Sequence, residues 1–66
     1  MRAEDHLLLT VADTAEVLRV SRITVYRLIW AGVLRPVYIG RAVRIPRAEV
    51  ERFVMEAQER ERVATR

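Results

Sequence analysis

The sequence contains no cysteine and no lysine, and it has one serine, one histidine, two glycines and two prolines. Without cysteine, neither disulfides nor thiolate metal sites can stabilise the chain. The single histidine, His6, has no second ligand at metal-binding spacing, so we expect no metal site. Since Ser21 is the only serine and there is no glycine-rich phosphate loop, we also expect no cofactor and no catalytic residues: the protein is predicted not to be an enzyme.

Long hydrophobic runs are missing as well. The longest uninterrupted one, 28–34, is far shorter than the roughly 20 residues that span a bilayer, so no membrane association is expected. A chain of 66 residues can form one domain at most. We therefore expect a single small soluble domain over 1–66, with a core of about 8–57 and with mobile or extended ends at 1–7 and 58–66.

Acidic residues are absent from the middle of the chain. The segment 17–48, called the arginine block below, contains seven arginines and no aspartate or glutamate. The segments on either side contain more acidic than basic residues, so the formal net charge of +3 arises entirely in this block. Such an asymmetry indicates a surface that faces a polyanion, and the planar fork of arginine suits phosphates and guanine edges.

Two helices separated by a short turn are predicted for the first half of the chain. Thr10 and Asp13 have the form of an N-terminal helix cap, and the apolar residues behind them recur on one face of a helix over about 11–19. Ser21 is the predicted N-cap of a second helix, and Gly32 stands where a left-handed residue would end it. Two helices around so short a turn form a helix-turn-helix.

After Gly32 the apolar residues alternate, which is typical of strands. Gly40 and Arg41 fit a two-residue turn with glycine in its first position, so strands over 37–39 and 42–45 form a two-stranded wing. Because a hairpin alone is barely stable in water, its apolar face is expected to lie against the helices. We assign to that face Val37, Ile39, Val43 and Ile45.

A third helix is predicted to close the core. Pro46 suits its first turn, and apolar residues then recur at helical spacing from Val50 to Ala57. The charged segment 58–66 is expected to continue this helix as a solvated, fraying tail. The predicted fold is therefore mostly α with a small β-hairpin: a winged helix-turn-helix of three helices and a two-stranded wing.

Residues 8–54, "LLTVADTAEVLRVSRITVYRLIWAGVLRPVYIGRAVRIPRAEVERFV", resemble the excisionase-type, MerR-like winged helix-turn-helix domains. The resemblance rests on the leading "LLT", the helix "VSRITVYRLI", the glycine that ends it, "YIGRAVRIP" and the closing amphipathic helix. This family includes phage and mobile-element excisionases, also called recombination directionality factors, and transcriptional regulators. The sequence shows neither the long coiled coil nor the effector domain of full MerR regulators, which favours the excisionase or small-regulator branch.

The resemblance implies a cytoplasmic DNA-binding protein of a prokaryotic cell or of the host cell of a phage. Several copies would bind cooperatively to adjacent direct repeats near an attachment site, bend the duplex and steer an integrase toward excision in DNA recombination. Two alternatives remain open. The same fold can serve as a small regulator of transcription, or the basic surface can dock on an acidic protein.

The candidate DNA contacts on the second helix lie on the face away from the core. Arg22 is the candidate for pairing with a guanine, and Ser21, Thr24 and Tyr26 for bonding phosphates, with Arg27 beside them. The alternative is that Ser21 only caps the helix and the other side chains form a solvated face.

Two apolar residues on the same face stand apart from this pattern. Ile23 is a candidate for touching a thymine methyl. Trp30 is expected to pack over the base of the wing or against a neighbouring subunit.

The candidate DNA contacts on the wing are Gly40, Arg41 and Arg44. Gly40 lets the turn approach a phosphate backbone, Arg41 at the tip can reach into the adjoining minor groove, and Arg44 can grip a flanking phosphate. The alternative is that these charges merely keep an exposed hairpin from pairing with other strand edges.

Overall fold

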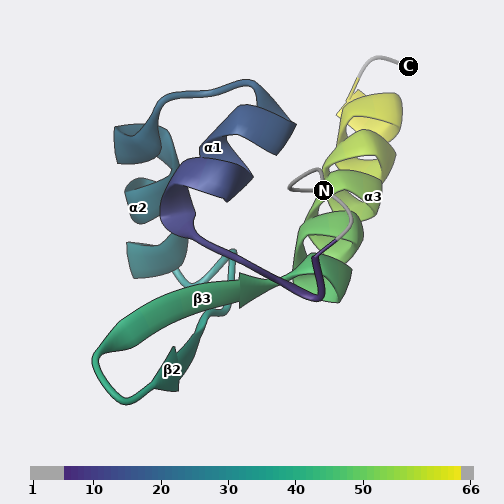
Figure 1. Ribbon diagram of the computed structural model, residues 1–66. Coiled ribbons are helices and arrows are strands. Elements are labelled where there is room, and N and C mark those ends of the chain that lie inside the picture. The colour runs from purple at the N-terminus through teal and green to yellow at the C-terminus, as the bar shows by residue number, and fades with distance from the viewer. Residues whose placement is uncertain (1–5, 65–66) are drawn as a thin grey trace.

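The computed structural model, which describes residues 6–64, has three helices packed around a small antiparallel sheet (Figure 1). The fold prediction is confirmed, with one short strand more than expected. Of the predicted mobile or extended ends, 1–7 and 58–66, residues 1–5 and 65–66 lie outside the described residues. In chain order the elements are β1 (Leu8–Leu9), α1 (Val11–Leu18), α2 (Arg22–Trp30), β2 (Val37–Ile39), β3 (Ala42–Pro46) and α3 (Arg47–Ala64).

Side-chain caps fix the start of both helices of the helix-turn-helix, as predicted. The backbone N–H of Asp13 donates to Oγ1 of Thr10 over 2.9 Å, and the N–H of Thr10 donates to Oδ2 of Asp13 over 3.2 Å. Oγ of Ser21 accepts from the N–H of Thr24 over 3.1 Å. Both caps satisfy helix N–H groups that have no partner within the helix.

Both helices also end in the same way, although only one end was predicted. Gly32, with φ of 79°, ends α2 as expected, and the N–H groups of Gly32 and Val33 bond to carbonyls of the last turn. Arg19 has the same left-handed conformation after α1, with φ of 61°. A side chain is strained in this conformation, and glycine is the residue usually found there.

Replacing Arg19 with glycine is therefore expected to stabilise the protein. A residue with a Cβ in the left-handed conformation destabilises the folded state by about 1–2 kcal/mol. Glycine removes this strain, but its greater freedom in the unfolded chain cancels part of the gain. We therefore expect the free energy of unfolding to rise by about 0.5–1 kcal/mol. Urea unfolding followed by circular dichroism measures the gain. Gly32→Ala, at the glycine with the same conformation, is expected to lose stability, and a loss in both variants would contradict the argument.

The strand β3 lies in the middle of the sheet, between β1 and β2. The strand β1 was not predicted; it pairs Leu8 with Pro46 and Leu9 with Ile45. The prediction that Pro46 lies in the first turn of the third helix is wrong, because Pro46 ends β3 and α3 begins one residue later. The N–H that proline lacks is not needed here, since the next residue, Arg47, supplies the N–H that bonds to the carbonyl of Leu7 over 2.9 Å.

The register of the wing corrects a second prediction. The hairpin pairs Ile39 with Ala42 and Val37 with Arg44. Because residues that face each other across two strands share one side of the sheet, Val37 and Ile39 lie on the side of Arg44, opposite the side of Ile45. Tyr38 is the one residue of β2 on the side of Ile45, and it is 69% exposed, so within the wing only β3 packs apolar residues against the helices.

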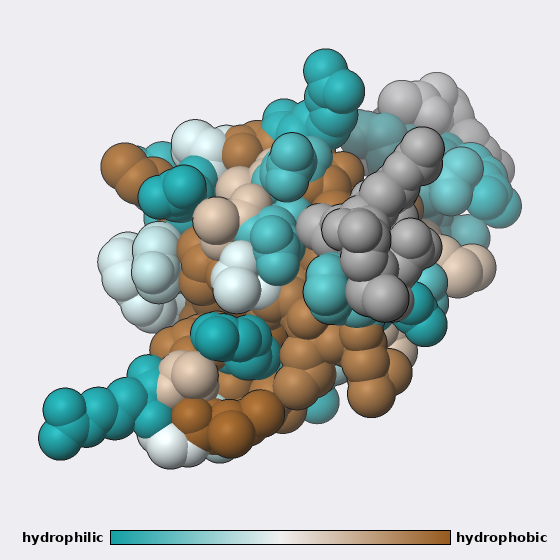
Figure 2. Space-filling model, viewed as in Figure 1, coloured by the Kyte–Doolittle hydropathy of each residue, from teal (hydrophilic) through white to brown (hydrophobic). Residues whose placement is uncertain are grey.

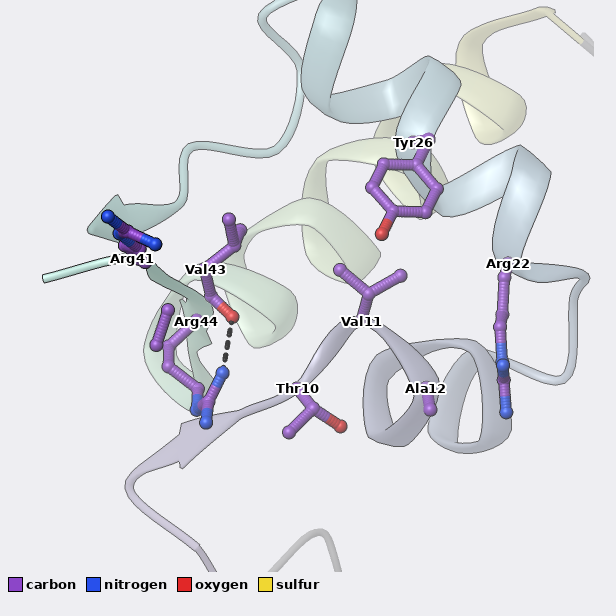
Figure 3. Close-up of a pocket in the computed structure, with 9 residues that line it drawn as sticks. Thr10, Val11, Ala12, Arg22, Tyr26, Arg41, Val43 and Arg44 are labelled. Atoms are coloured by element: carbon purple, nitrogen blue, oxygen red, sulfur yellow. Dashed lines mark hydrogen bonds between the residues drawn. The ribbon is translucent and has the colours of Figure 1, made fainter. Parts of the chain in front are cut away.

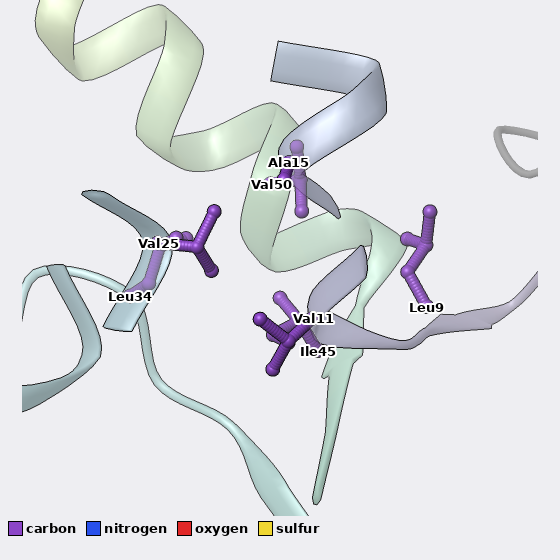
Figure 4. Packing of buried hydrophobic residues seen from close by; sticks show 7 residues of the cluster. All are labelled: Leu9, Val11, Ala15, Val25, Leu34, Ile45 and Val50. Atoms are coloured by element: carbon purple, nitrogen blue, oxygen red, sulfur yellow. The ribbon is translucent and has the colours of Figure 1, made fainter. Parts of the chain in front are cut away.

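The core is formed by one cluster of side chains drawn from every element except β2 (Figure 4). Partly buried residues of α1, α2, β3 and α3 pack around it. The single buried polar side chain among the described residues is that of Thr14, whose hydroxyl donates to the carbonyl of Thr10 over 2.9 Å. The buried cluster consists of Leu9, Val11, Ala15, Val25, Leu34, Ile45 and Val50.

A charged clamp, formed by Glu49 and Arg52, fastens α3 to the loop between α2 and β2. Oε2 of Glu49 accepts from the N–H of Arg35 over 3.1 Å, and Nη2 of Arg52 donates to the carbonyl of Val33 over 2.9 Å. The two side chains also bond to each other, and Arg52 bonds to Glu56 over 2.7 Å. The clamp therefore holds the start of the wing by its backbone.

No helix of the described chain is long and apolar enough to span a membrane.

The clamp predicts a specific pH dependence of stability. The hydrogen bond from Arg52, together with the N–H of Arg35, lowers the pKa of Glu49 below its ordinary value of 4.5, although burial acts in the opposite direction. A carboxyl with a lowered pKa in the folded state stabilises fully above its ordinary pKa, and the contribution is lost as the pH falls through the folded value. The stability difference between wild type and Glu49→Gln is therefore expected to shrink as the pH falls below the ordinary pKa of 4.5. Urea titrations at each pH measure it, and a constant difference would contradict the clamp.

Candidate nucleic-acid interface

A cleft of about 370 Å³ lies between α2, the wing and the start of α1 (Figure 3). Its walls come from segments that are far apart in the sequence: the first residues of α1, the first two turns of α2, and the turn and outer half of β3. The cleft is lined by Thr10, Val11, Ala12, Arg22, Tyr26, Arg41, Ala42, Val43 and Arg44.

Arginines stand on both sides of this cleft. Arg22 comes from the first turn of α2, whereas Arg41 comes from the tip of the wing and Arg44 from β3. Within residues 6–64, neither Arg22 nor Arg41 forms an ion pair with a carboxylate, and both side chains are exposed. Their charges are therefore available to a ligand in the cleft. Arg22 and Arg41, both candidates for DNA contact, thus line one cleft.

Arg44 is held more closely than the other two. Its Nη1 donates to the carbonyl of Val43 over 2.9 Å, and its side chain is half-buried (Figure 3). A guanidinium has five N–H donors, so this bond leaves others for a ligand. The contact also keeps the charge of Arg44 close to its own strand.

Tyr26 reaches the cleft from α2, and its ring is supported by an aromatic contact within the same helix. Its ring stacks on that of Trp30, with 5.7 Å between the ring centroids and 28° between the planes. Trp30 is 76% exposed, so the prediction that it packs over the base of the wing is wrong, whereas the alternative contact with a neighbouring subunit stays a prediction. One helical turn separates the two residues, and that spacing brings their rings together.

Four of the predicted contact residues are not part of the lining. Ser21 and Thr24 bond to each other: Oγ of Ser21 accepts from the backbone N–H of Thr24, and the two hydroxyl oxygens lie 3.0 Å apart. Arg27 is exposed on α2, and Gly40 forms the turn with φ of 60° and open space around it. Direct contacts by these four residues stay predictions.

The start of α1 is the part of the cleft that the sequence did not reveal. Thr10, Val11 and Ala12 line it, and the first amides of a helix have no partner within the helix. The capping box locates this helix start in the sequence, but nothing local indicates that it lies beside the wing. Asp13, whose carboxylate caps the same turn, offsets part of the positive end of the helix.

The helix α3 stands apart from α2 and the wing tip (Figure 1) and carries both signs of charge. Its exposed carboxylates are Glu51, Glu56, Glu59 and Glu61, and the first three pair with arginines of the same helix. In the described part of the chain, no group of three or more histidine, cysteine or acidic side chains could hold a metal ion.

Comparison with known proteins identifies the family. A family described as "Helix-turn-helix domain" matches residues 8–58. Two curated proteins of Mycobacterium tuberculosis, "Putative DNA-binding protein MT0521" (strain CDC 1551 / Oshkosh) and "Putative DNA-binding protein Rv0500A" (strain ATCC 25618 / H37Rv), are each 53% identical to this chain over 38 residues. The match covers 58% of this chain and 49% of each relative, so the chain spans about half the length of the curated relatives it matches. No solved structure matches the chain. Because the family match covers well over half of its residues, the chain belongs to the helix-turn-helix domain family.

Proposed function

We propose that this protein binds duplex DNA, with α2 in the major groove and the wing in the adjoining minor groove. The observation that carries the proposal is the cleft, in which Arg22 and Arg41 from different elements face one opening without carboxylate partners among residues 6–64. The arginine block supplies the charge, and a recognition helix places its first residues nearest the bases. The names of the two mycobacterial relatives support the same function.

The contacts divide into those that read bases and those that set position. Arg22 pairs with a guanine, and Arg41 enters a narrow A·T-rich minor groove. Phosphates are held by Tyr26, Arg27 and Arg44, and by the hydroxyls of Ser21 and Thr24 where their mutual bond opens. Gly40 lets the turn come close to the backbone without a side chain in the way.

The biological role that we favour is that of an excisionase, a recombination directionality factor. One module of this size covers only about 600–1,000 Å², so tight and selective binding calls for several copies on adjacent direct repeats. Those copies bend the DNA near an attachment site and direct the integrase of a phage or mobile element, in the cytoplasm of the host cell. The acidic side of α3 suits a head-to-tail contact with the arginine block of the next copy.

A small transcriptional regulator is the second candidate, since the same surface bound at a promoter would block or recruit polymerase. Footprinting separates the two roles. A phased row of protected sites beside an attachment site supports the excisionase, whereas protection confined to a promoter supports the regulator. A docking module for an acidic protein is the weaker third alternative.

Salt dependence tests DNA binding itself. If about five phosphates are contacted, the logarithm of the affinity is expected to fall with the logarithm of the salt concentration at a slope near −4 to −5. Gel shifts or fluorescence anisotropy of labelled duplexes measure this slope. Failure to retard any duplex at low salt would rule out DNA binding and favour the protein-docking alternative.

A further inference from the structure

The strand β2 is exposed and entirely apolar, which is unusual for the edge of a sheet. Val37, Tyr38 and Ile39 are 38%, 69% and 57% exposed, and β2 has a neighbouring strand on one side only. Proteins usually protect such an edge with charges, because an apolar edge strand invites aggregation. Here none of the three residues is charged. The exposed surface of β2 therefore calls for a role other than packing within this chain.

Ile39 is the residue of β2 that comes closest to the tip of the wing. It directly precedes Gly40 and Arg41, and the register puts it on the outer side of the hairpin, away from Ile45. Hydrophobic side chains gather along the lower edge of the molecule, where the hairpin projects (Figure 2). The tip thus carries an apolar side chain next to a charged one.

The charges around the wing tip indicate which kind of molecule it binds. Arg41 and Arg44 flank Ile39, and the nearest acidic residues in the sequence lie outside the arginine block. The minor groove is only about 6 Å wide and is lined with phosphates, so a hairpin can enter it by the side chains at its positively charged tip and not by its two strands. Proteins that bind the minor groove combine arginines with apolar wedges, isoleucine among them, which enter between base pairs, partly unstack them and kink the duplex.

We propose that Ile39 is such a wedge: it enters the minor groove beside Arg41, partly unstacks one base step and produces the bend. This inference rests on the DNA binding proposed above and adds the residue that deforms the DNA. Flexible pyrimidine–purine steps such as TA are the easiest to unstack. The wedge therefore also makes the protein prefer such a step at this position of the DNA, although no hydrogen bond to the bases is made there.

The test uses the full chain and duplexes recovered from a random pool by the wild-type protein. 2-Aminopurine, which fluoresces when it is unstacked, replaces adenine at successive positions, and end-to-end energy transfer reports the bend. Wild type is expected to raise the fluorescence at one step of the flank, and Ile39→Ala to abolish both this rise and the bend. The affinity of Ile39→Ala is expected to change by less than about threefold, because the cost of unstacking disappears together with the contact.

Two further variants complete the experiment. Ile39→Leu keeps a wedge and is expected to keep the signal. Met55→Ala removes a side chain that is 70% exposed on α3 and is expected to change nothing. Binding without unstacking at any position would overturn the wedge and leave DNA binding intact, whereas failure to bind any duplex would overturn both. Loss of cooperative binding in both Ile39→Ala and Met55→Ala, with unstacking unchanged, would assign the outer side of the wing to a second copy and also overturn the wedge.

Discussion

Replacing Arg22 with alanine is expected to weaken binding to the preferred duplex by about 5- to 150-fold, the equivalent of about 1–3 kcal/mol, and to flatten the preference at one base pair. The side chain is exposed at the first turn of α2 and lines the cleft without a carboxylate partner in the described chain. Its truncation is therefore expected to remove the proposed DNA contact and to leave the fold intact. Titrations against duplexes that each carry one substituted base pair measure the effect.

The matched change at the wing should behave differently. Arg41→Ala is expected to lose affinity mainly on duplexes with A·T-rich flanks, because a narrow minor groove attracts arginine most strongly. Arg60→Ala removes the same charge from an exposed position on α3 and serves as the control, with little expected effect. Equal losses from Arg22→Ala and Arg41→Ala on every sequence would contradict the division between base contact and groove contact.

Leu34→Ala is expected to cause the largest loss of stability, about 2–5 kcal/mol. Leu34 is 0% exposed in the middle of the core, and its N–H bonds to the carbonyl of Leu28, so the surrounding structure has little freedom to fill the cavity. Small domains are stable by only about 5–15 kcal/mol, and this one buries few large side chains, so much of its stability would be lost. Urea unfolding followed by circular dichroism measures the change.

Leu7→Ala is the control for this prediction. Leu7 is 76% exposed, and the structure uses its backbone carbonyl rather than its side chain. We expect its replacement to change the unfolding free energy by less than about 0.5 kcal/mol. Similar losses in the two variants would mean that burial at Leu34 does not set the stability of the core.

The helices of the fold could be predicted because their ends are encoded locally. The cap residues Thr10 and Ser21 and the terminating Gly32 act within a few residues of sequence, and each occupies its predicted place. The strand β1 has only two residues, too few to show an alternating pattern, and its pairing with Pro46 depends on tertiary contact. The sides of the wing could have been derived, because a two-residue turn after Ile39 fixes which residues face each other.

The candidate site could be predicted in charge but not in shape. The absence of acidic residues around Arg22 and Arg41 already indicates one basic surface, and the two do line one cleft. The start of α1 completes that cleft through packing that no local pattern records. Trp30 was expected over the base of the wing or against a neighbouring subunit; within the chain it stacks on Tyr26 at the surface and does not pack on the wing, and the subunit contact stays a prediction.

The direct passage from β3 into α3 has a mechanical consequence. The strand ends at Pro46 and the helix begins at Arg47, so no flexible joint separates the hairpin from the longest helix. The Glu49–Arg52 clamp fastens the other end of the hairpin, at Arg35, to the same helix. The hairpin and α3 are therefore expected to move as one unit, so that a close fit between this part of the protein and a ligand requires the ligand to deform.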